Sequence, residues 1–376
     1  MGSSEQESEA IKVEARRVAP VFSGRSLVAL RELRGETQAA VAEVAGITAS
    51  ALSQAERGHT TLSVGNIARL AQYFKVSPAA FTERRELELQ MQPQFRHLRS
   101  TSVREQRKAE RFVIATAQTA SILRDLVDSP EPFSFTYPVD PELPIDEVKK
   151  EVERAAAQTR SALGLPQSKP VSFKLVKCLE HGGISVVRDS ETDGDIDAYS
   201  AVVDQLPVIV LDGGKESVWD RDNFTLAHEL GHLVMHRGIS HTPGTRTVEA
   251  QAHRFAGAFL GPARVLREVL PRDLDWASYF ELKCEWGMSM AALVRRAKDL
   301  GVIDDSMYTR AMKQMSAYGW RKTEPGSTDR SLPIPRMLRR AMTSAEISTS
   351  RLAKQAHLPK DVVLRIVGKR KPSVIH

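Results

Sequence analysis

The spacing of apolar positions divides the chain into two kinds of region. In most of it, apolar residues recur every three or four positions, which predicts amphipathic helices. This pattern runs through residues 26–81, 148–162, 224–236 and 248–260, and on to 315. Between the helical stretches lie three short β-branched runs bounded by turn residues, at 184–187, 198–203 and 208–211. They predict a small sheet of about three strands. We therefore expect an α+β, mostly helical protein.

Segments without such a pattern mark the expected ends and joints. Residues 1–22 are rich in Glu, Ser and Ala and have nothing periodic to bury, which predicts a flexible tail. Residues 84–111, rich in Arg, Glu and Gln, predict a connecting helix plus a loop. Residues 129–144 contain five prolines and form the clearest linker in the sequence. A second linker is expected near Pro325.

The composition narrows the class of protein. A length of 376 residues allows two or three domains, and 41% hydrophobic with 27% charged residues is ordinary for a soluble globular chain. No stretch approaches the roughly 20 apolar residues of a membrane helix, and the acidic, polar N-terminus lacks the apolar core of a secretory signal. Cys178 and Cys284 lie outside any CxxC spacing, so we expect a reducing cytoplasm and no disulfide.

Residues 37–58 predict two short helices around a tight turn. Thr37 is a suitable N-cap for the first helix, and Gly46 can supply the positive φ of the turn. The second helix is expected to begin near Thr48 and to stop at Gly58. Two such helices form a helix-turn-helix, whose second helix enters the major groove of DNA. The alternative is a helical bundle used only for dimerisation or partner binding, since residues 21–83 carry six basic and five acidic residues.

This segment resembles the repressor-type helix-turn-helix domains of phage and bacterial regulators. The resemblance implies that Gln38 contacts the phosphate backbone of double-stranded operator DNA and that one face of the second helix turns toward the bases. The expected DNA-facing residues of this helix are Thr48, Ala49, Ser50, Ser53 and Gln54. Gln can read adenine bidentately, whereas Ala and Ser offer little more than single contacts. Arg57 is expected at a phosphate. Such modules commonly bind palindromes as dimers, so we expect a homodimer.

A second motif, HExxH, lies in the segment Phe224-Thr-Leu-Ala-His-Glu-Leu-Gly-His-Leu-Val-Met-His236. On a helix, His228 and His232 project from the same face about one turn apart. Both imidazoles can then bind one Zn²⁺ at about 2.0–2.1 Å. Glu229, beside the first ligand, can take a proton from an attacking water without binding the metal itself. Gly231 leaves room for another segment to pack closely.

The surroundings of the motif favour a metal over a chance match. Its neighbours are mostly apolar, so the helix is expected to be buried, and its two histidines and glutamate need partners. A buried polar network without metal is the alternative. A catalytic zinc takes a third protein ligand, and Glu249 lies on the inward face of the next helix. His253 is a competing ligand or a partner that orients one, and His236 is expected to pack against or orient His232.

Together these features resemble the ImmA/IrrE family of metallopeptidases over residues 150–300. The resemblance is carried by the HExxH segment and by Glu249-x-x-Ala-x-x-Phe-Ala-x-x-Phe-Leu-Gly-Pro262. Asp195-Ile-Asp-Ala-Tyr-Ser200, Pro207-Val-Ile-Val-Leu-Asp212 and Trp286-Gly-Met-Ser-Met290 add to it. One departure is His253, where the family usually has Asn, which bears on the surroundings of the ligands.

The resemblance implies a small zincin that cleaves helix-turn-helix repressors and so derepresses mobile-element or DNA-damage genes. It gives His228, His232 and Glu249 as zinc ligands and Glu229 as the general base. Single-stranded DNA is a candidate activator. A repressor-like module ahead of the peptidase is also similar to a fused subclass of the family.

The C-terminal segment is basic, with ten Lys/Arg and two acidic residues between 331 and 371. Residues 348–368 again predict helix, turn and helix. The apolar positions that can close a small core are Leu352, Ala353, Ala356, Leu358, Val362, Val363 and Ile366. Followed by Lys369-Arg-Lys371, this pair is either a second nucleic-acid contact or a helical pair packed on the peptidase.

The expected order of parts follows from these motifs. It is a flexible tail (1–22), a helix-turn-helix domain (23–85), a connecting helix and Pro-rich linker (86–146), a zincin-like metallopeptidase domain (147–265), a helical extension (266–325) and a basic C-terminal helical segment that is a candidate second helix-turn-helix (326–376).

The expected function is that of a cytoplasmic, nucleoid-associated zinc endopeptidase, bacterial or phage-encoded, that cleaves a helix-turn-helix repressor while its own helix-turn-helix binds operator DNA. The alternative is a DNA-binding regulator whose zinc domain senses or stabilises without turnover. Glu229 favours the peptidase, because a purely structural zinc site is closed and has no use for an acidic base. Self-cleavage between Glu110 and Pro144 is a third hypothesis.

Overall fold

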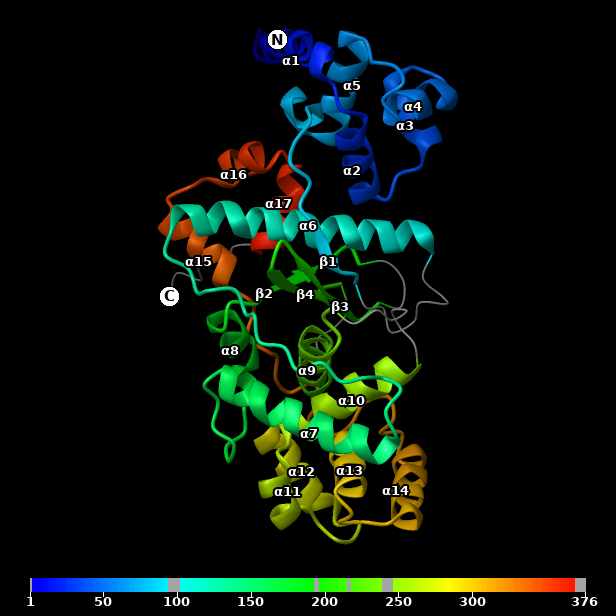
Figure 1. Ribbon diagram of the computed structural model, residues 1–376, viewed down its shortest axis with the longest axis vertical. Helices are drawn as coiled ribbons and strands as arrows, with labels where there is room; N and C mark the ends of the chain where they lie inside the picture. Colours follow the sequence, from blue (N-terminus) through cyan, green and yellow to red (C-terminus); the bar gives the residue numbers. More distant parts are fainter. Residues whose placement is uncertain (1, 94–101, 193–195, 215–217, 239–245, 369–376) are drawn as a thin grey trace. The chain divides into compact units, whose positions relative to one another are not determined.

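The computed structural model describes residues 2–93, 102–192, 196–214, 218–238 and 246–368. It divides into two compact units. Unit 1 comprises Met1–Leu89, Arg99–Ser129 and Arg336–His376, and unit 2 comprises Gln90–Leu98 and Pro130–Pro335. The chain therefore passes from unit 1 to unit 2 and back twice, and each unit is built from separate segments. The predicted fold class, α+β and mostly helical, is confirmed (Figure 1).

Unit 1 begins with a bundle of short helices. They are α1 (Gly2–Val18), η1 (Ala19–Val21), α2 (Gly24–Arg34), α3 (Gln38–Ala45), α4 (Ala49–Glu56), α5 (Val64–Phe74) and η2 (Pro78–Phe81). The helices enclose an apolar core that includes Leu27, Val41, Leu52, Ile67 and Phe74, all fully buried. Burial of this apolar face holds α2 to α5 together, since each of these helices is shorter than the about 12–15 residues that a helix needs to be stable alone.

Local hydrogen bonds fix the helix-turn-helix. The Thr37 hydroxyl accepts from the Ala40 amide at 3.2 Å and the Thr48 hydroxyl from the Ala51 amide at 3.1 Å, so each helix has an N-cap. Gly46 ends α3 with φ 70°, the left-handed turn that glycine favours. The cap at Thr37 and the turn at Gly46 are confirmed. Gly24 at the start of α2 lies against the end of α4, because a Cβ there would come within 2.1 Å of the Ala55 carbonyl oxygen.

The N-terminal segment differs from the flexible tail expected at residues 1–22. It forms helix α1, and Ala15 and Val18 are buried against the bundle. The Ser77 hydroxyl donates to the Glu14 carboxylate at 2.5 Å. The apolar stripe of Ile11, Ala15 and Val18 is only one residue wide. The polar composition of the segment therefore did not predict a helix.

The C-terminal helices complete unit 1. Helices α15 (Met337–Ser344), α16 (Thr349–Ala356) and α17 (Lys360–Val367) pack on the long α6 (Val103–Leu126) (Figure 1). The expected small core is present, with Leu352, Val362 and Val363 buried. The structure assigns these helices to unit 1, where they pack on α6. A nucleic-acid contact by this segment stays a prediction. Residues 369–371 lie outside the described part of the chain.

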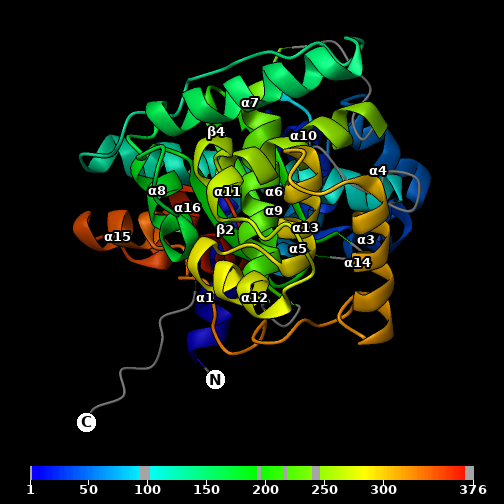
Figure 2. The ribbon, with the colours of Figure 1, turned by 90° about the horizontal axis from the view of Figure 1, so that it is seen from below.

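Unit 2 combines a small sheet with helices. Its elements are α7 (Ile145–Ala162), η3 (Ser172–Lys174), α8 (Leu175–His181), β2 (Ser185–Asp189), β3 (Ala198–Val203), β4 (Leu206–Asp212), α9 (Trp219–Met235), α10 (Arg246–Leu260), α11 (Ala263–Val269), α12 (Trp276–Trp286), α13 (Met290–Asp299) and α14 (Asp305–Ala317). Helix α9 packs on β3 and β4 on one side and on α7 and α10 on the other, which places it near the centre of the unit (Figure 2).

The sheet has the strand order β1-β3-β4-β2. β2 runs parallel to β4, with Ser185 opposite Val208, and β3 runs antiparallel to β4, with Ala198 opposite Leu211. Asp204 and Gln205 join β3 to β4 with positive φ angles of 45° and 66°, as in a tight two-residue hairpin. The three predicted strands are present, and the sheet gains a fourth, β1 (Leu89–Met91). A strand of three residues is too short to show an alternating pattern.

The proline-rich segment differs from the expected open linker. Its Tyr137 amide donates to the Val234 carbonyl at 2.9 Å, and Val139 is buried. Close to it, Gly183 has φ 81°, and a Cβ there would clash with the Glu131 carbonyl. Residues 129–144 thus form an extended segment, here called the strap, that is bound along the end of α9 by backbone hydrogen bonds. None of the described helices is long and apolar enough to cross a membrane.

Candidate metal centre and catalytic site

The predicted metal-binding histidines lie on the buried helix α9. The sequence around them is apolar on nearly every side, so α9 is covered by the sheet and by α7 and α10. His228 and His232 are both buried, at 8% and 1% exposure. Gly231 allows α10 to approach, because a Cβ there would lie 2.9 Å from Cδ1 of Phe255. The close packing expected at Gly231 is confirmed, and it brings the start of α10 beside both histidines.

Glu249 of α10 completes a cluster of three ligand atoms. The Nε2 atoms of His228 and His232 are 3.1 Å apart, and Glu249 oxygens lie 3.3 Å and 3.5 Å from them. Atoms bound at about 2.0–2.1 Å to one tetrahedral ion are about 3.3–3.4 Å apart. The spacing of the three side chains therefore fits a single ion of the size of zinc.

The state of the Glu249 carboxylate supports this fit. Both of its oxygens are buried, and neither has a hydrogen-bond partner among the described residues. A buried carboxylate without a partner is costly, so it indicates a missing cation. Two imidazoles and one carboxylate are also a donor set typical of catalytic zinc. His228, His232 and Glu249 therefore fit a zinc ion.

Glu229 lies next to this cluster on the wall of a cavity. It is 4% exposed, and its carboxylate accepts a hydrogen bond of 2.7 Å from the Ser200 hydroxyl of β3. Ser200 thereby fixes the rotamer of Glu229. The sequence reasoning assigned no role to Ser200, although the residue ends one of the segments that carry the family resemblance. Only the pairing of β3 beneath α9 reveals the contact.

A chain of hydrogen bonds continues behind His232. Its Nδ1 lies 2.9 Å from Nδ1 of His236, His236 Nε2 lies 2.9 Å from Oε1 of Gln251, and the Gln251 amide donates to the Asp140 carbonyl at 3.1 Å. If His232 Nε2 is the ligand atom, its Nδ1 carries the proton and donates to His236. His236 Nε2 then donates to Gln251 Oε1, and the Gln251 amide donates to the Asp140 carbonyl. The strap thus anchors a ligand, a role that sequence reasoning missed for Gln251 and Asp140.

The second histidine of α10 has a different position. His253 is exposed on the cavity wall, and its ring centroid lies 4.8 Å from that of Phe224. The geometry favours Glu249 over His253 as the third ligand, because the cluster of ligand atoms is formed by His228, His232 and Glu249. Its predicted role in orienting a ligand stays a prediction.

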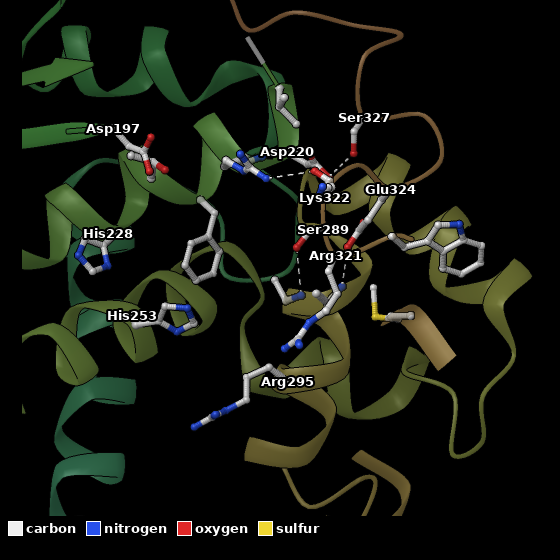
Figure 3. Close-up of a pocket in the computed structure, with 18 of the residues that line it drawn as sticks. Asp197, Asp220, His228, His253, Ser289, Arg295, Arg321, Lys322, Glu324 and Ser327 are labelled. Carbon is white, nitrogen blue, oxygen red and sulfur yellow. Dashed lines mark hydrogen bonds between the residues drawn. The ribbon is translucent and has the colours of Figure 1, made fainter. Parts of the chain in front are cut away.

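The cavity beside the metal cluster has a volume of about 460 Å³. His228 and His253 lie on one side of it, and Arg321, Glu324 and Ser289 lie on the opposite side (Figure 3). Glu229 also lines the cavity. A volume of this size is typical of a ligand site.

A buried ion cluster holds the far wall of this cavity. Lys283, fully buried, lies 2.7 Å from Asp220 and 2.9 Å from Glu324, and it donates to the Ser327 hydroxyl at 2.6 Å. Glu324 also accepts from the amides of Met290 and Ala291 at 2.7 and 2.9 Å. Both acids are therefore compensated. Exposed charged residues that line the cavity include Arg221, Arg295, Arg321 and Lys322.

Comparison with known families finds two domains in the chain. Residues 179–298 match the model of Peptidase M78, the IrrE N-terminal-like domain. Residues 27–81 match a helix-turn-helix family model. The chain thus contains a peptidase-family domain and a DNA-binding domain. The resemblance drawn from the motifs is confirmed by these two matches. A search of curated proteins gave no match to the chain.

The predicted DNA-facing residues lie on or beside α4. Ala49, Ser50 and Arg57 are exposed, whereas Ser53 and Gln54 are half-buried. Arg57 donates to the Ser53 hydroxyl at 2.7 Å, and Gln54 Oε1 lies 2.8 Å from Nδ1 of His59. The Gln38 amide donates to Glu56 at 2.7 Å, and Thr48 caps α4. Their contacts to DNA stay predictions.

Proposed function

We propose that this protein is a zinc-dependent endopeptidase of the zincin type that cleaves a helix-turn-helix repressor, while its own helix-turn-helix binds operator DNA. The observation that carries the proposal is the Glu249 carboxylate, buried without a hydrogen-bond partner in the described chain and 3.3 and 3.5 Å from two imidazoles. The match of residues 179–298 to a peptidase family supports it.

The residues of the chain divide the work of peptide hydrolysis. His228, His232 and Glu249 would hold the zinc, which supplies a Lewis acid that polarises water and the scissile carbonyl. Glu229 takes the proton of the attacking water and passes it to the leaving amine. Ser200 holds the Glu229 carboxylate in place, at 2.7 Å, so that little reorganisation is needed. Glu229 is buried, which strengthens each of these interactions.

The cavity lining bears on the substrate. Its floor is apolar, with Met312, Met315 and Trp320, and its rim carries the exposed Arg221, Arg321 and Lys322. A cationic rim over an apolar floor favours an apolar side chain beside the scissile bond with acidic residues near it. The sequence of a cleaved substrate tests this preference.

Self-cleavage between Glu110 and Pro144 is not proposed. Residues up to 126 belong to helix α6, and the strap that follows is bound by its backbone and by Phe133 and Val139, which are buried. Peptidases act on extended, accessible segments, so a folded helix and a packed strap are poor substrates.

The competing function is a DNA-binding regulator whose zinc has no catalytic role. A structural zinc would fill its fourth position with a protein ligand. In the described chain the cluster has three ligands beside a cavity that also exposes Glu229. This arrangement favours the peptidase.

The test is a comparison of new protein N-termini in cells that express the native protein or Glu229→Gln, before and after DNA damage. We expect fragments of a helix-turn-helix repressor only with the native protein, with acidic residues around the cut. Identical fragments in both strains, while the purified native protein holds zinc and binds DNA, would favour the regulator.

A further inference from the structure

Unit 1 contains a second cavity, distant in sequence from the peptidase residues. Its volume is about 230 Å³. Four segments of unit 1 form its wall. They are α2, the residues after η2, α6, and the turn between α16 and α17. Leu30, Leu33, Ala115 and Leu358 supply a buried apolar surface. The cavity therefore has a place for an apolar group.

The same cavity is lined by Arg84, and also by the acidic residues Glu83 and Glu86. Arg84 donates to the carbonyl oxygens of Ala80 and Ala356, and its Nε is buried with no hydrogen-bond partner in the described structure. Burial is the cause that lowers the pKa of Arg84, with no acid opposing it. Arg111 in the same wall differs, because it lies 2.9 Å from Glu32 and 3.0 Å from Glu86.

A second polar atom of the wall also lacks a partner. His357 connects α16 to α17 in the left-handed conformation, φ 53°, and its buried Nδ1 makes no hydrogen bond to a described residue. Burial and the neighbouring Arg84 lower the pKa of His357, against Glu14, which raises it, and the neutral ring can present an N–H at Nδ1. The Nε of the half-buried Arg84 and the Nδ1 of His357 are buried without partners among the described residues, and both carry a desolvation cost that a ligand would remove.

We propose that this cavity binds a small organic monocarboxylate. The carboxylate accepts hydrogen bonds from Arg84 Nε and His357 Nδ1, and its apolar body packs among Leu30, Leu33 and Leu358. An inorganic anion would leave the apolar wall unfilled, and a neutral apolar molecule would leave Arg84 without a counter-charge. The volume, below the roughly 300–1,000 Å³ of drug-sized sites, limits the ligand to a short chain or a single ring.

The test is calorimetric titration of the purified full-length chain with benzoate and with hexanoate. The neutral amides, benzamide and hexanamide, are the matched probes without charge. We expect at least one of the two acids to bind saturably with a Kd of about 1 mM or tighter, and its amide to bind at least about tenfold more weakly.

Three variants locate the site. Arg84→Leu removes the charge and is expected to weaken the acid about tenfold or more. Ala29→Phe fills the cavity and leaves Arg84 in place, so it is expected to abolish binding even if Arg84→Leu disturbs folding. Arg340→Leu, at an exposed arginine of α15, should bind like the native chain. The proposal is overturned if neither acid binds saturably, if the amides bind equally well, or if folded Ala29→Phe retains native affinity.

Discussion

Two regions of this protein contain its candidate sites, the helix pair α9 and α10 and the helix α4, and their polar side chains are in opposite states. On α9, His228 and His232 are buried, and the buried Glu249 carboxylate oxygens of α10 have no hydrogen-bond partner among the described residues. On α4 the polar side chains are bonded to their neighbours, Arg57 to Ser53 and Gln54 to His59.

The difference teaches how strongly each site depends on its ligand. A buried carboxylate without a partner costs free energy until a cation binds, so Glu249 indicates specifically that this site binds a cation. Exposed side chains exchange neighbours for water or DNA at little cost, so the α4 surface says much less about its target. The predictions below separate the two helices, from the largest effect to the smallest.

Glu229→Gln is expected to lower the rate of peptide hydrolysis about 10²–10⁴-fold, because an amide cannot take a proton from water. Zinc content and duplex DNA binding should not change, since Glu229 contacts neither. Hydrolysis of a substrate peptide by the purified variant measures the effect. Glu268→Gln, at an exposed position of α11, is the control.

Glu249→Gln is expected to weaken zinc binding by more than about 100-fold, beyond the about 10–100-fold typical of partners outside the ligand set. Without zinc, the same substitution should not destabilise the protein. The variant should be as stable as the native chain or more so, because a buried unpaired charge has been removed. Thermal unfolding with and without chelator measures both. A zinc-free variant clearly less stable than zinc-free native protein would mean that Glu249 has another partner.

His236→Ala is expected to weaken zinc about 10–100-fold, because His232 loses the acceptor at 2.9 Å that fixes its tautomer. Competition with a zinc chelator measures the affinity. His181→Ala, at an exposed histidine of α8, should leave it unchanged. An unchanged affinity in His236→Ala would show that packing alone orients His232.

Gly231→Ala should destabilise the protein by about 1–2 kcal/mol, since the added Cβ would lie 2.9 Å from the Phe255 ring. Gly257→Ala on α10 is its counterpart, with the nearest atom at 3.9 Å, and should stabilise by about 0.5–1 kcal/mol. Urea unfolding of both variants gives the free energies. Equal effects would mean that α9 and α10 can separate to admit a methyl group.

Gln54→Ala should weaken binding to the operator by about 1 kcal/mol at most, because part of the lost contact is already made to His59. Fluorescence titration of a labelled operator duplex measures it, and peptide hydrolysis should be unaffected. Gln72→Ala, exposed on α5, is the control. A loss confined to one operator position would identify the base that Gln54 reads.

Much of the metal site could be predicted from sequence because its geometry is local. A spacing of four on one helix places His228 beside His232, and Glu249 follows on the next helix. The contacts that could not be predicted come from distant segments: Ser200 from β3, and Asp140 from the strap. Both depend on how the sheet and the prolines pack on α9, which no local pattern encodes.

Three parts of the fold differ from the prediction, namely α1, β1 and the strap. Helix α1 and strand β1 were not expected, because a stripe of Ile11, Ala15 and Val18 and a run of three residues carry little periodic signal. The strap at 129–144 looks open by composition, yet backbone hydrogen bonds to α9 hold it. Prolines predict an extended conformation, and only tertiary contacts decide whether an extended segment is free or packed.

The most direct test of the central claim is metal content and hydrolysis measured on one purified sample, before zinc removal, after it and after zinc is returned. We predict one zinc ion per native chain, loss of cleavage of the repressor on chelation, and recovery when zinc alone is added. Native protein that takes up no zinc at micromolar concentration, or that cleaves equally well without it, would contradict the account.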